Sequence, residues 1–143
     1  MTWAFDYVEK TPLTTEDNYP YFGKYYGCML DPTEKGVGTL TSYTNIAKDE
    51  PDQLKAAIAQ SPTSILIAGS SPAFMSYHSG ILDDPSCGEK QDHGVLAVGY
   101  GEGYFIVKNS WGADWGEKGY IRVSDSKANI CGILSGATLP SLK

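Results

Sequence analysis

The chain has 143 residues, which predicts a single domain at roughly 100–200 residues per domain. Hydrophobic residues make up 41% and charged residues 20%, a composition that excludes intrinsic disorder of the whole chain. With 11 basic and 17 acidic residues the net charge is −6, and Arg122 is the only arginine, so the clustered cationic surface that nucleic acid requires is missing.

No segment of the sequence is suited to cross a membrane. The longest apolar runs, residues 65–68 and 94–98, are far shorter than the roughly 20 residues that a spanning helix needs. The opening residues MTWAFDYVEK contain no basic segment followed by an apolar one, so they do not form a signal peptide. We expect no membrane partner, and either the protein stays where it is made or a leader preceded this chain.

The N-terminal part is predicted to hold one helix and one strand around a long connection. Apolar residues at helical spacing predict an uncapped helix over residues 1–10, which Thr11 and Pro12 end. Residues 13–35 are rich in Pro, Gly, Tyr and Asp, a composition typical of turns held by aromatic packing. Alternating apolar and polar residues over 37–46 predict a strand with one face in water.

The rest of the chain is predicted to contain a helix, a strand and one helical turn, followed by several strands. Residues 50–60 predict a helix, because Asp49 can cap it, Pro51 suits its first turn and an apolar stripe follows. The β-branched run at 64–68 predicts a buried strand, and one helical turn is expected at 74–77. Short antiparallel strands with glycine-rich turns are then expected at 93–100, 104–109, 119–124 and 136–139.

The three cysteines, Cys28, Cys87 and Cys131, form no CxxC pair. Their spacing therefore supports neither a zinc site nor a complete set of disulfides, and an odd number leaves one thiol over. We expect no metal ion and no cofactor.

The two histidines occupy different settings. His93 follows Asp92 at the start of the run GVLAVGYG, so it lies at one end of a strand. Imidazole is the likeliest general base near neutral pH, but a single histidine at a strand end is usually structural or solvated. His78 follows Tyr77 in a turn, and we interpret it as a surface residue.

An aromatic, glycine-rich segment follows the strand YFIVK and contains Asn109, Trp111 and Trp115. A turn that covers the core with indole rings would explain it. A chemical interpretation is also open, because an Asn carbonyl oxygen can accept a hydrogen bond from an imidazole N–H while an indole shields that bond from water. His93 and Asn109, on strands joined by the turn at 101–103, would meet at one end of the sheet.

Three long motifs link the chain to a known family. DHGVLAVGYG at 92–101, YFIVKNSWGADWGEKGYIRV at 104–123 and NICGI at 129–133 closely resemble the C-terminal part of papain-like cysteine peptidases, the cathepsin L group in particular. Matches at SGIL, KAAIAQSPTSILI, EDNYPY and MTWAF extend the likeness over essentially the whole chain. The resemblance implies an α+β fold. Residues 36–143 would be the right domain, an antiparallel β-barrel-like sheet with short helices that carries His and Asn, and residues 1–35 would be the last helix of the left domain and the crossover.

The resemblance also implies roles for individual residues. His93 matches the catalytic imidazole and Asn109 the amide that orients it, with Asp92 in support. Trp111 matches the indole that shields their hydrogen bond, and Trp115 an aromatic residue near the leaving-group side of the cleft. The pocket for the substrate residue second from the cut corresponds to Met1, Leu66, Gly94 and Gly136. This uncharged lining implies a preference for a bulky apolar or aromatic side chain, without a specific reward for arginine.

The catalytic cysteine of the family has no counterpart in this chain. In the family it lies in a Cys-Gly-Ser/Ala-Cys-Trp/Tyr segment roughly 130–150 residues before the His and Asn. Counting back from His93 passes Met1, and none of the three cysteines lies in such a segment. The oxyanion-stabilising Gln of the family is missing for the same reason. We therefore expect the C-terminal portion of a cysteine endopeptidase, inactive without the missing N-terminal half.

The same resemblance implies how the cysteines pair. Cys87 and Cys131 match a disulfide that clips the loop before His93 to the C-terminal strand, which stabilises the fold by roughly 3–5 kcal/mol through chain entropy. Cys28 matches a cysteine whose partner lies in the N-terminal half, so it is expected to be unpaired here. Three reduced, buried thiols are the alternative.

Two other functions remain open. A catalytically inactive papain-like homologue could act as a protein-binding module through an exposed half-cleft. A carbohydrate-binding sheet would explain Trp3, Trp111 and Trp115 but not the pairing of His93 with Asn109. For the peptidase we expect peptide or protein substrates, the N-terminal half and a propeptide or protein inhibitor as partners. The resemblance implies a lysosomal, vacuolar or extracellular location.

Overall fold

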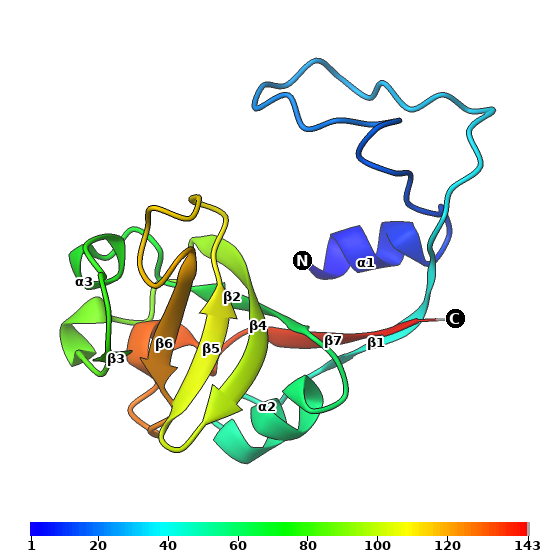
Figure 1. Cartoon of the computed structure of the whole chain (residues 1–143). Coiled ribbons are helices and arrows are strands. Elements are labelled where there is room, and N and C mark those ends of the chain that lie inside the picture. Colours follow the sequence, from blue (N-terminus) through cyan, green and yellow to red (C-terminus); the bar gives the residue numbers. More distant parts are fainter. Residues whose placement is uncertain (143) are drawn as a thin grey trace. The chain divides into compact units, whose positions relative to one another are not determined.

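The computed structural model describes residues 1–142, which form two compact units (Figure 1). The first unit comprises Met1–Tyr43 together with the C-terminal residues from Ser141, and the second comprises Thr44–Pro140. The division after residue 35 that the resemblance implies stays a prediction. None of the helices in residues 1–142 is both long and apolar enough to cross a membrane.

The first unit contains one short helix and a long irregular connection. The helix α1 spans Thr2–Val8 and has no side-chain hydrogen bond at its N-cap, as its sequence predicts. Asp6 on this helix accepts a hydrogen bond from the Tyr43 hydroxyl at 2.8 Å, and the rings of Phe5 and Tyr43 lie 5.6 Å apart. Residues 14–35 form no helix or strand, in agreement with their turn-rich composition.

The strands form a mixed sheet that is mostly antiparallel. Within the described residues the order is β1-β7-β2-β4-β5-β6-β3. The strands that the sequence predicts to be antiparallel pair in that sense, whereas β3, which the sequence pattern does not predict, pairs with β6 in the parallel sense. A parallel pair needs a long connection instead of a tight hairpin, and residues 83–119, which include the β4–β5 hairpin, provide it. The strands are β1 (Leu40–Asn45), β2 (Thr63–Ile67), β3 (Ile81–Leu82), β4 (His93–Gly101), β5 (Tyr104–Lys108), β6 (Tyr120–Ser124) and β7 (Ala137–Leu142).

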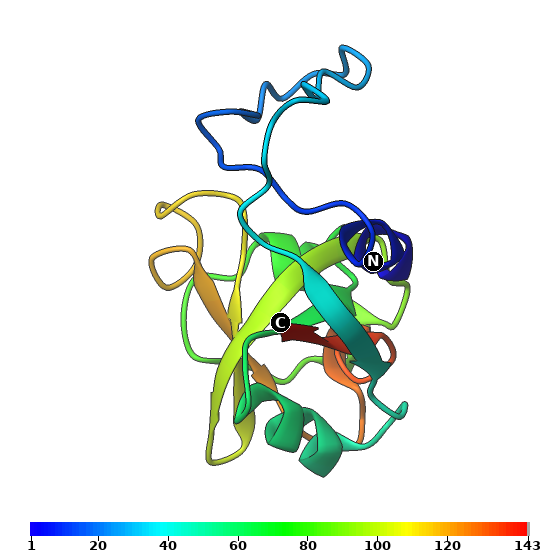
Figure 2. The same ribbon diagram turned by 90° about the vertical axis from the view of Figure 1, so that its right-hand side faces the viewer.

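Short helices accompany the sheet in the second unit. The helix α2 packs beside β4, as Figures 1 and 2 both show, and buries Leu54 almost completely. The helix α3 begins two residues before the predicted turn at 74–77, because Pro72 fits the first turn of a helix. These elements are α2 (Pro51–Ile58), α3 (Pro72–Met75) and two short 3₁₀ helices, η1 (Pro85–Cys87) and η2 (Ile130–Gly132).

Asp49 does not cap α2, contrary to the prediction. The N-cap residue is Glu50, and no side chain makes a capping hydrogen bond there. Asp49 has a φ of 59°, in the left-handed region, and its carboxylate accepts a hydrogen bond from Asn129 Nδ2 at 3.0 Å. The local pattern could not reveal this partner, because Asn129 lies 80 residues further along the chain.

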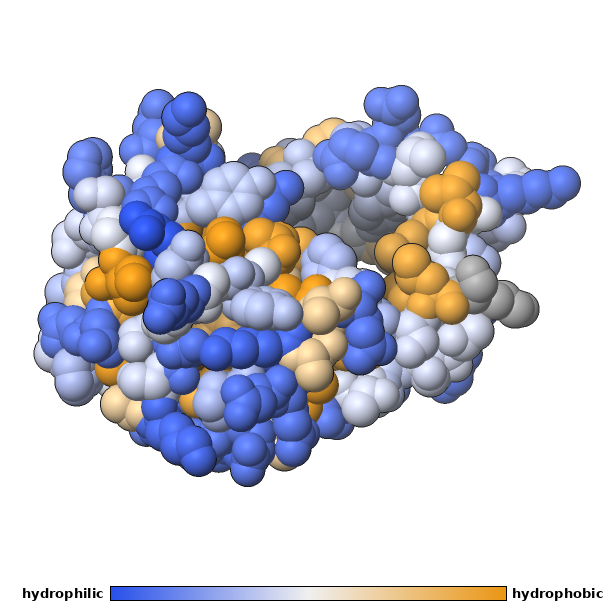
Figure 3. Space-filling model, turned by 60° about the horizontal axis from the view of Figure 1, so that its bottom comes forward, coloured by the Kyte–Doolittle hydropathy of each residue, from blue (hydrophilic) through white to orange (hydrophobic). Residues whose placement is uncertain are grey.

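The core of the second unit is formed by buried apolar side chains from its strands and its short helices. Burying each large apolar side chain contributes about 1.5–3 kcal/mol to folding. The face drawn in Figure 3 is mostly hydrophilic, and its hydrophobic residues form separate groups. The largest fully buried side chains include Leu54, Ile65, Ile67, Phe74, Phe105, Val107, Ile121, Val123, Ile130 and Ile133.

A β-bulge lies inside the hairpin formed by β4 and β5. Gly101 pairs with Tyr104 next to the turn, but the register shifts by one residue between Ala97 and Gly99. Because side chains alternate between the faces of a strand, this extra residue decides which side chains of β4 share a face with those of β5. The bulge therefore helps to set the orientation of the residues at the open end of the hairpin.

Candidate active site

His93 and Asn109 come together at the open end of the β4–β5 hairpin. His93 is the first residue of β4, and Asn109 directly follows the last residue of β5. His93 Nε2 lies 2.9 Å from Asn109 Oδ1, which is hydrogen-bond distance. The other histidine, His78, is exposed. The hairpin thus brings together the two residues that the sequence motifs singled out.

A backbone contact decides which atom of the Asn109 amide faces the imidazole. The Ser110 N–H donates a hydrogen bond to Asn109 Oδ1 at 2.8 Å, so the atom at this position must be the carbonyl oxygen. Because an oxygen of this kind only accepts, His93 Nε2 must carry the hydrogen that it donates to Oδ1. The other ring nitrogen, Nδ1, is left to exchange a proton with another group.

An aromatic cluster covers this hydrogen bond. The Trp111 ring stacks on the His93 ring, with centroids 5.1 Å apart and planes inclined by 24°. Phe74 contacts both tryptophans, at 5.4 Å from Trp111 and 5.1 Å from Trp115. The Trp115 indole N–H donates to the Met75 carbonyl at 3.1 Å. A hydrogen bond is stronger where apolar groups keep water away from it, so the cluster stabilises the oriented imidazole.

Gly69 is a site residue that the sequence pattern does not reveal. It lies two residues beyond Ile67, which pairs with His93 across β2 and β4. A Cβ atom added at Gly69 would lie 2.9 Å from His93 Cδ2, closer than packed atoms allow. Glycine is therefore needed for the backbone to approach the imidazole ring. Only the pairing of β2 with β4 places this residue at the site, and no local pattern encodes that pairing.

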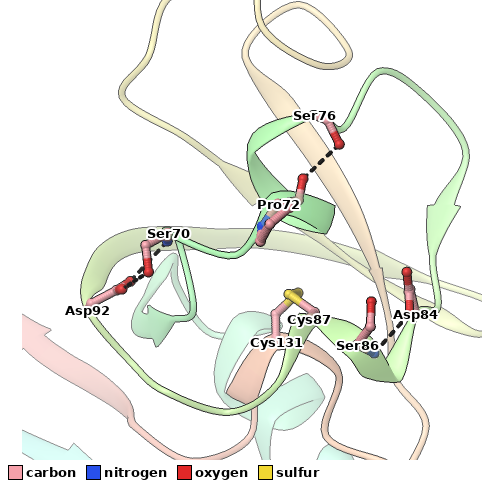
Figure 4. The surroundings of a disulfide bond; sticks show 8 residues. All are labelled: Ser70, Pro72, Ser76, Asp84, Ser86, Cys87, Asp92 and Cys131. Atoms are coloured by element: carbon pink, nitrogen blue, oxygen red, sulfur yellow. Dashed lines mark hydrogen bonds between the residues drawn. A yellow bond between two sulfur atoms is a disulfide. The ribbon is translucent and has the colours of Figure 1, made fainter.

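Asp92 precedes His93, and its carboxylate binds Ser70 (Figure 4). Ser70 donates to it from both the backbone N–H and the hydroxyl. The hydroxyl hydrogen bond is the main cause that holds the pKa of Asp92 below its ordinary value. The ionised carboxylate therefore ties the turn that contains Gly69 to the start of β4.

Three of the residues expected to line the substrate pocket are neighbours. Leu66 and Gly94 pair across β2 and β4, and the Leu66 N–H donates to the Gly136 carbonyl at 2.8 Å. Gln91, which the sequence pattern did not indicate, donates from Nε2 to the Leu66 carbonyl at 3.1 Å and so adjoins this group. The fourth expected residue, Met1, belongs to the first unit.

Cys87 and Cys131 form a disulfide that joins η1 to η2 (Figure 4). Both residues are buried. Cys28, in the first unit, is exposed and makes no disulfide with any residue that the structure describes. The second unit therefore has no free thiol beside the hydrogen-bonded imidazole of His93 and amide of Asn109.

No candidate metal centre accompanies this arrangement. Within residues 1–142, no group of three or more His, Cys, Asp or Glu side chains is placed to hold a metal ion.

Comparisons with known proteins match nearly the whole chain. Residues 1–141 match the family described as "Papain family cysteine protease". Cathepsin S of Rattus norvegicus is 40% identical over 148 residues, which cover 99% of this chain and 44% of the relative. A cathepsin L-like protein of Caenorhabditis elegans is 40% identical over 148 residues, covering 98% of this chain and 44% of the relative.

The fold agrees with a solved structure of the same kind. The Carica candamarcensis cysteine protease CMS1MS2 in complex with E-64 superimposes with a TM-score of 0.89 and 34% identity, covering 97% of this chain and 66% of that protein. The chain thus has a papain-like α+β fold and spans less than half the length of the two relatives named above. Since the family match extends over residues 1–141, the chain belongs to the papain family of cysteine proteases.

Proposed function

We propose that this chain supplies the base and its orienting amide to a cysteine endopeptidase. The observation that carries the proposal is the hydrogen bond from His93 Nε2 to Asn109 Oδ1 at 2.9 Å, with the oxygen held in place by the Ser110 N–H. This arrangement leaves His93 Nδ1 as the basic nitrogen. The nucleophilic thiol would come from a part of the protein outside this chain, so the chain alone is inactive.

In the proposed reaction His93 transfers protons in both halves of the cycle. Nδ1 takes the proton of the cysteine thiol, which gives a thiolate and an imidazolium. The thiolate attacks the peptide carbonyl, the C–N bond breaks, and the imidazolium gives its proton to the leaving amine. Water, losing a proton to His93, then hydrolyses the thioester and restores the thiol. Asn109 Oδ1 accepts the Nε2 hydrogen throughout and keeps the ring oriented.

We also propose a substrate preference for this enzyme. Leu66, Gly94 and Gly136 would line the pocket for the residue second from the cut, and none of these side chains is charged. An apolar pocket favours a bulky apolar or aromatic side chain and gives an arginine no partner for its charge.

The partner that we propose is the N-terminal half of the same enzyme. Large aromatic side chains of the first unit are almost fully exposed, with Trp3 at 88%, Tyr21 at 87% and Tyr25 at 91%. Exposed apolar surface of this kind usually marks a contact with another polypeptide. A propeptide or protein inhibitor would bind the completed cleft, and the enzyme would work in a lysosome or vacuole or outside the cell.

Reassembly of a complete enzyme tests this function. The chain would be refolded together with the N-terminal half of Rattus norvegicus cathepsin S, which would supply the thiol, and assayed with a fluorogenic Leu-Arg peptide. We expect cleavage that requires a reduced thiol and is blocked by E-64. His93→Ala should abolish cleavage, while His78→Ala, which changes the exposed histidine, serves as the matched control and should preserve it.

Two outcomes of this experiment would contradict the proposed peptidase function. If the two halves form a folded complex that cleaves no peptide, the endopeptidase proposal fails. Stable association without cleavage would instead favour an inactive homologue that works as a protein-binding module.

A further inference from the structure

Glu117 and Arg122 form a bidentate ion pair, with two hydrogen bonds between the guanidinium and the carboxylate, next to the aromatic cluster. Arg122 donates from Nε to Glu117 Oε2 at 2.9 Å and from Nη2 to Oε1 at 2.6 Å. The Gly80 N–H donates to the same carboxylate at 3.0 Å. A planar guanidinium that makes two parallel hydrogen bonds to a carboxylate fixes position and direction together, which a lysine cannot do. The pair is thus suited to hold the segment that contains Glu117 against β6.

Tyr77 links this ion pair to the tryptophans. Its hydroxyl donates to the Gly80 carbonyl at 2.6 Å and accepts a hydrogen bond from the Arg122 backbone N–H at 3.3 Å. The Tyr77 ring lies 5.7 Å from the Trp115 ring. Trp115 in turn meets Trp111 edge to face at 5.3 Å. A continuous set of contacts therefore runs from the ion pair to the ring that stacks on the imidazole.

The tryptophan segment, residues 110–119, is held on one side by Phe74 and by the Trp115 hydrogen bond to the Met75 carbonyl, and it is closed by a few backbone hydrogen bonds. The Asn109 N–H donates to the Gly119 carbonyl at 2.9 Å and the Gly119 N–H to the Trp115 carbonyl at 2.8 Å, while Glu117 and Tyr120 exchange backbone hydrogen bonds at 2.9 and 3.2 Å. Trp111 itself is 41% exposed, so burial alone does not fix its ring. A strong contact at the far end of the segment is therefore expected to matter for its position.

We propose that Glu117 and Arg122 are positioning residues for the catalytic imidazole. By holding the tryptophan segment against β6 and Gly80, they keep Trp111 stacked on His93 and so keep water away from the His93–Asn109 hydrogen bond. A link to catalysis rests on the proposed function. The packing itself is a property of this chain and can be measured without the other half.

The decisive measurement is the NMR signal of the His93 ring protons in the full chain. Stacking under an indole shifts these protons upfield, and His78→Gln identifies which signals belong to His93 because the chain has only two histidines. Glu117→Gln keeps the size of the side chain but removes its charge. We expect loss of the upfield shift and faster solvent exchange of the Nε2 proton in this variant.

Asp125→Asn is the matched control. It breaks another partly buried ion pair of the second unit, in which Lys55 Nζ lies 2.5 Å from Asp125 Oδ2, and Asp125 touches none of the rings described above. The control should leave the His93 signals unchanged. Equal loss of the upfield shift in both variants would mean that any broken ion pair loosens the site, and this result would overturn the proposal, as would an unchanged shift in Glu117→Gln.

A second variant covers the case in which Glu117→Gln does not fold. Arg122→Lys keeps the positive charge but cannot form the bidentate pair of hydrogen bonds with Glu117. It should therefore reduce the upfield shift of the His93 ring protons while the chain stays folded. Wild-type signals in this variant would overturn the proposal. In the reassembled enzyme we expect Glu117→Gln to lower kcat about tenfold at an unchanged KM, because only the orientation of the base is affected. Absence of cleavage by the unmutated assembly would count against the proposed function, while the NMR result still decides the positioning role.

Discussion

Gly69 and His93 lie in such close contact that no side chain fits between them. A Cβ atom at Gly69 would be 2.5 Å from His93 Cβ and 2.8 Å from His93 Cγ. The imidazole is therefore confined on one side by backbone and on another by the Trp111 ring, which stacks on it. Its direction toward Asn109 follows from both contacts.

Gly69→Ala is expected to displace the imidazole. The added methyl group overpacks a buried position, which typically costs about 1–3 kcal/mol of unfolding free energy. Urea unfolding measures that loss, and the His93 ring signals should move with it. Gly94→Ala is the matched control for stability, because a Cβ there meets no atom within 4 Å. If Gly69→Ala leaves both the stability and the His93 signals at wild-type values, the backbone contact does not confine the ring.

In Asn109→Ala the His93 imidazole is expected to be no longer fixed in one tautomer. Without Oδ1 as acceptor, the hydrogen on Nε2 loses its partner, and the neutral ring should become a mixture of the Nε2–H and Nδ1–H forms. Long-range ¹H–¹⁵N spectra distinguish these forms directly. In the reassembled enzyme kcat should fall by about 10²-fold, as for a misoriented base.

The control for this substitution is Asn45→Ala, which removes an amide that binds Thr138 Oγ1 at 3.1 Å and lies outside the aromatic cluster. It should leave the His93 spectrum unchanged. A His93 that stays entirely in the Nε2–H form in Asn109→Ala would show that another group sets the tautomer.

Loss of the disulfide is expected to weaken the second unit. Cys87 and Cys131 are 44 residues apart, and closing a loop of this size stabilises a fold by about 4 kcal/mol in the chain-entropy model. The double variant Cys87→Ala/Cys131→Ala should therefore lose about 2–4 kcal/mol in denaturant unfolding. Cys28→Ser changes an exposed thiol and should have no effect. Equal stability of the double variant and the wild type would show that the packing around η1 and η2 suffices.

Local sequence patterns were sufficient for the parts of the fold that local contacts determine. The apolar stripe and Pro51 predicted α2 within two residues at each end, and the alternation around the turn at 101–103 predicted the hairpin of β4 and β5. The same hairpin made the approach of His93 to Asn109 predictable, because both residues flank its two strands. These features depend on neighbours in the chain.

Features that depend on distant residues could not be predicted in this way. Gly69 reaches the imidazole only through the pairing of β2 with β4, and the parallel β3–β6 pair has no local signature. Asp49 looked like a helix cap, but Asn129 binds it instead. The sequence analysis makes no prediction for the Glu117–Arg122 pair, and the contact of Glu117 with Gly80 joins segments that lie 37 residues apart.

The ion pair of Glu117 also predicts a dependence of stability on pH. Arg122 lowers the pKa of Glu117 from 4.5 to about 2 in the folded chain, mainly through the side-chain hydrogen bonds. A carboxyl whose pKa is lowered by folding stabilises the fold above its unfolded pKa, and this contribution disappears as the pH falls through the folded value. The wild type should therefore exceed Glu117→Gln in unfolding free energy by about 1–2 kcal/mol near neutral pH, a value discounted for partial exposure. The difference in unfolding free energy should shrink between pH 4.5 and about 2. Comparing the two proteins at the same pH cancels the titration of the other carboxylates, which both proteins share. A difference that stays constant over this range would show that the charge of Glu117 does not stabilise the fold.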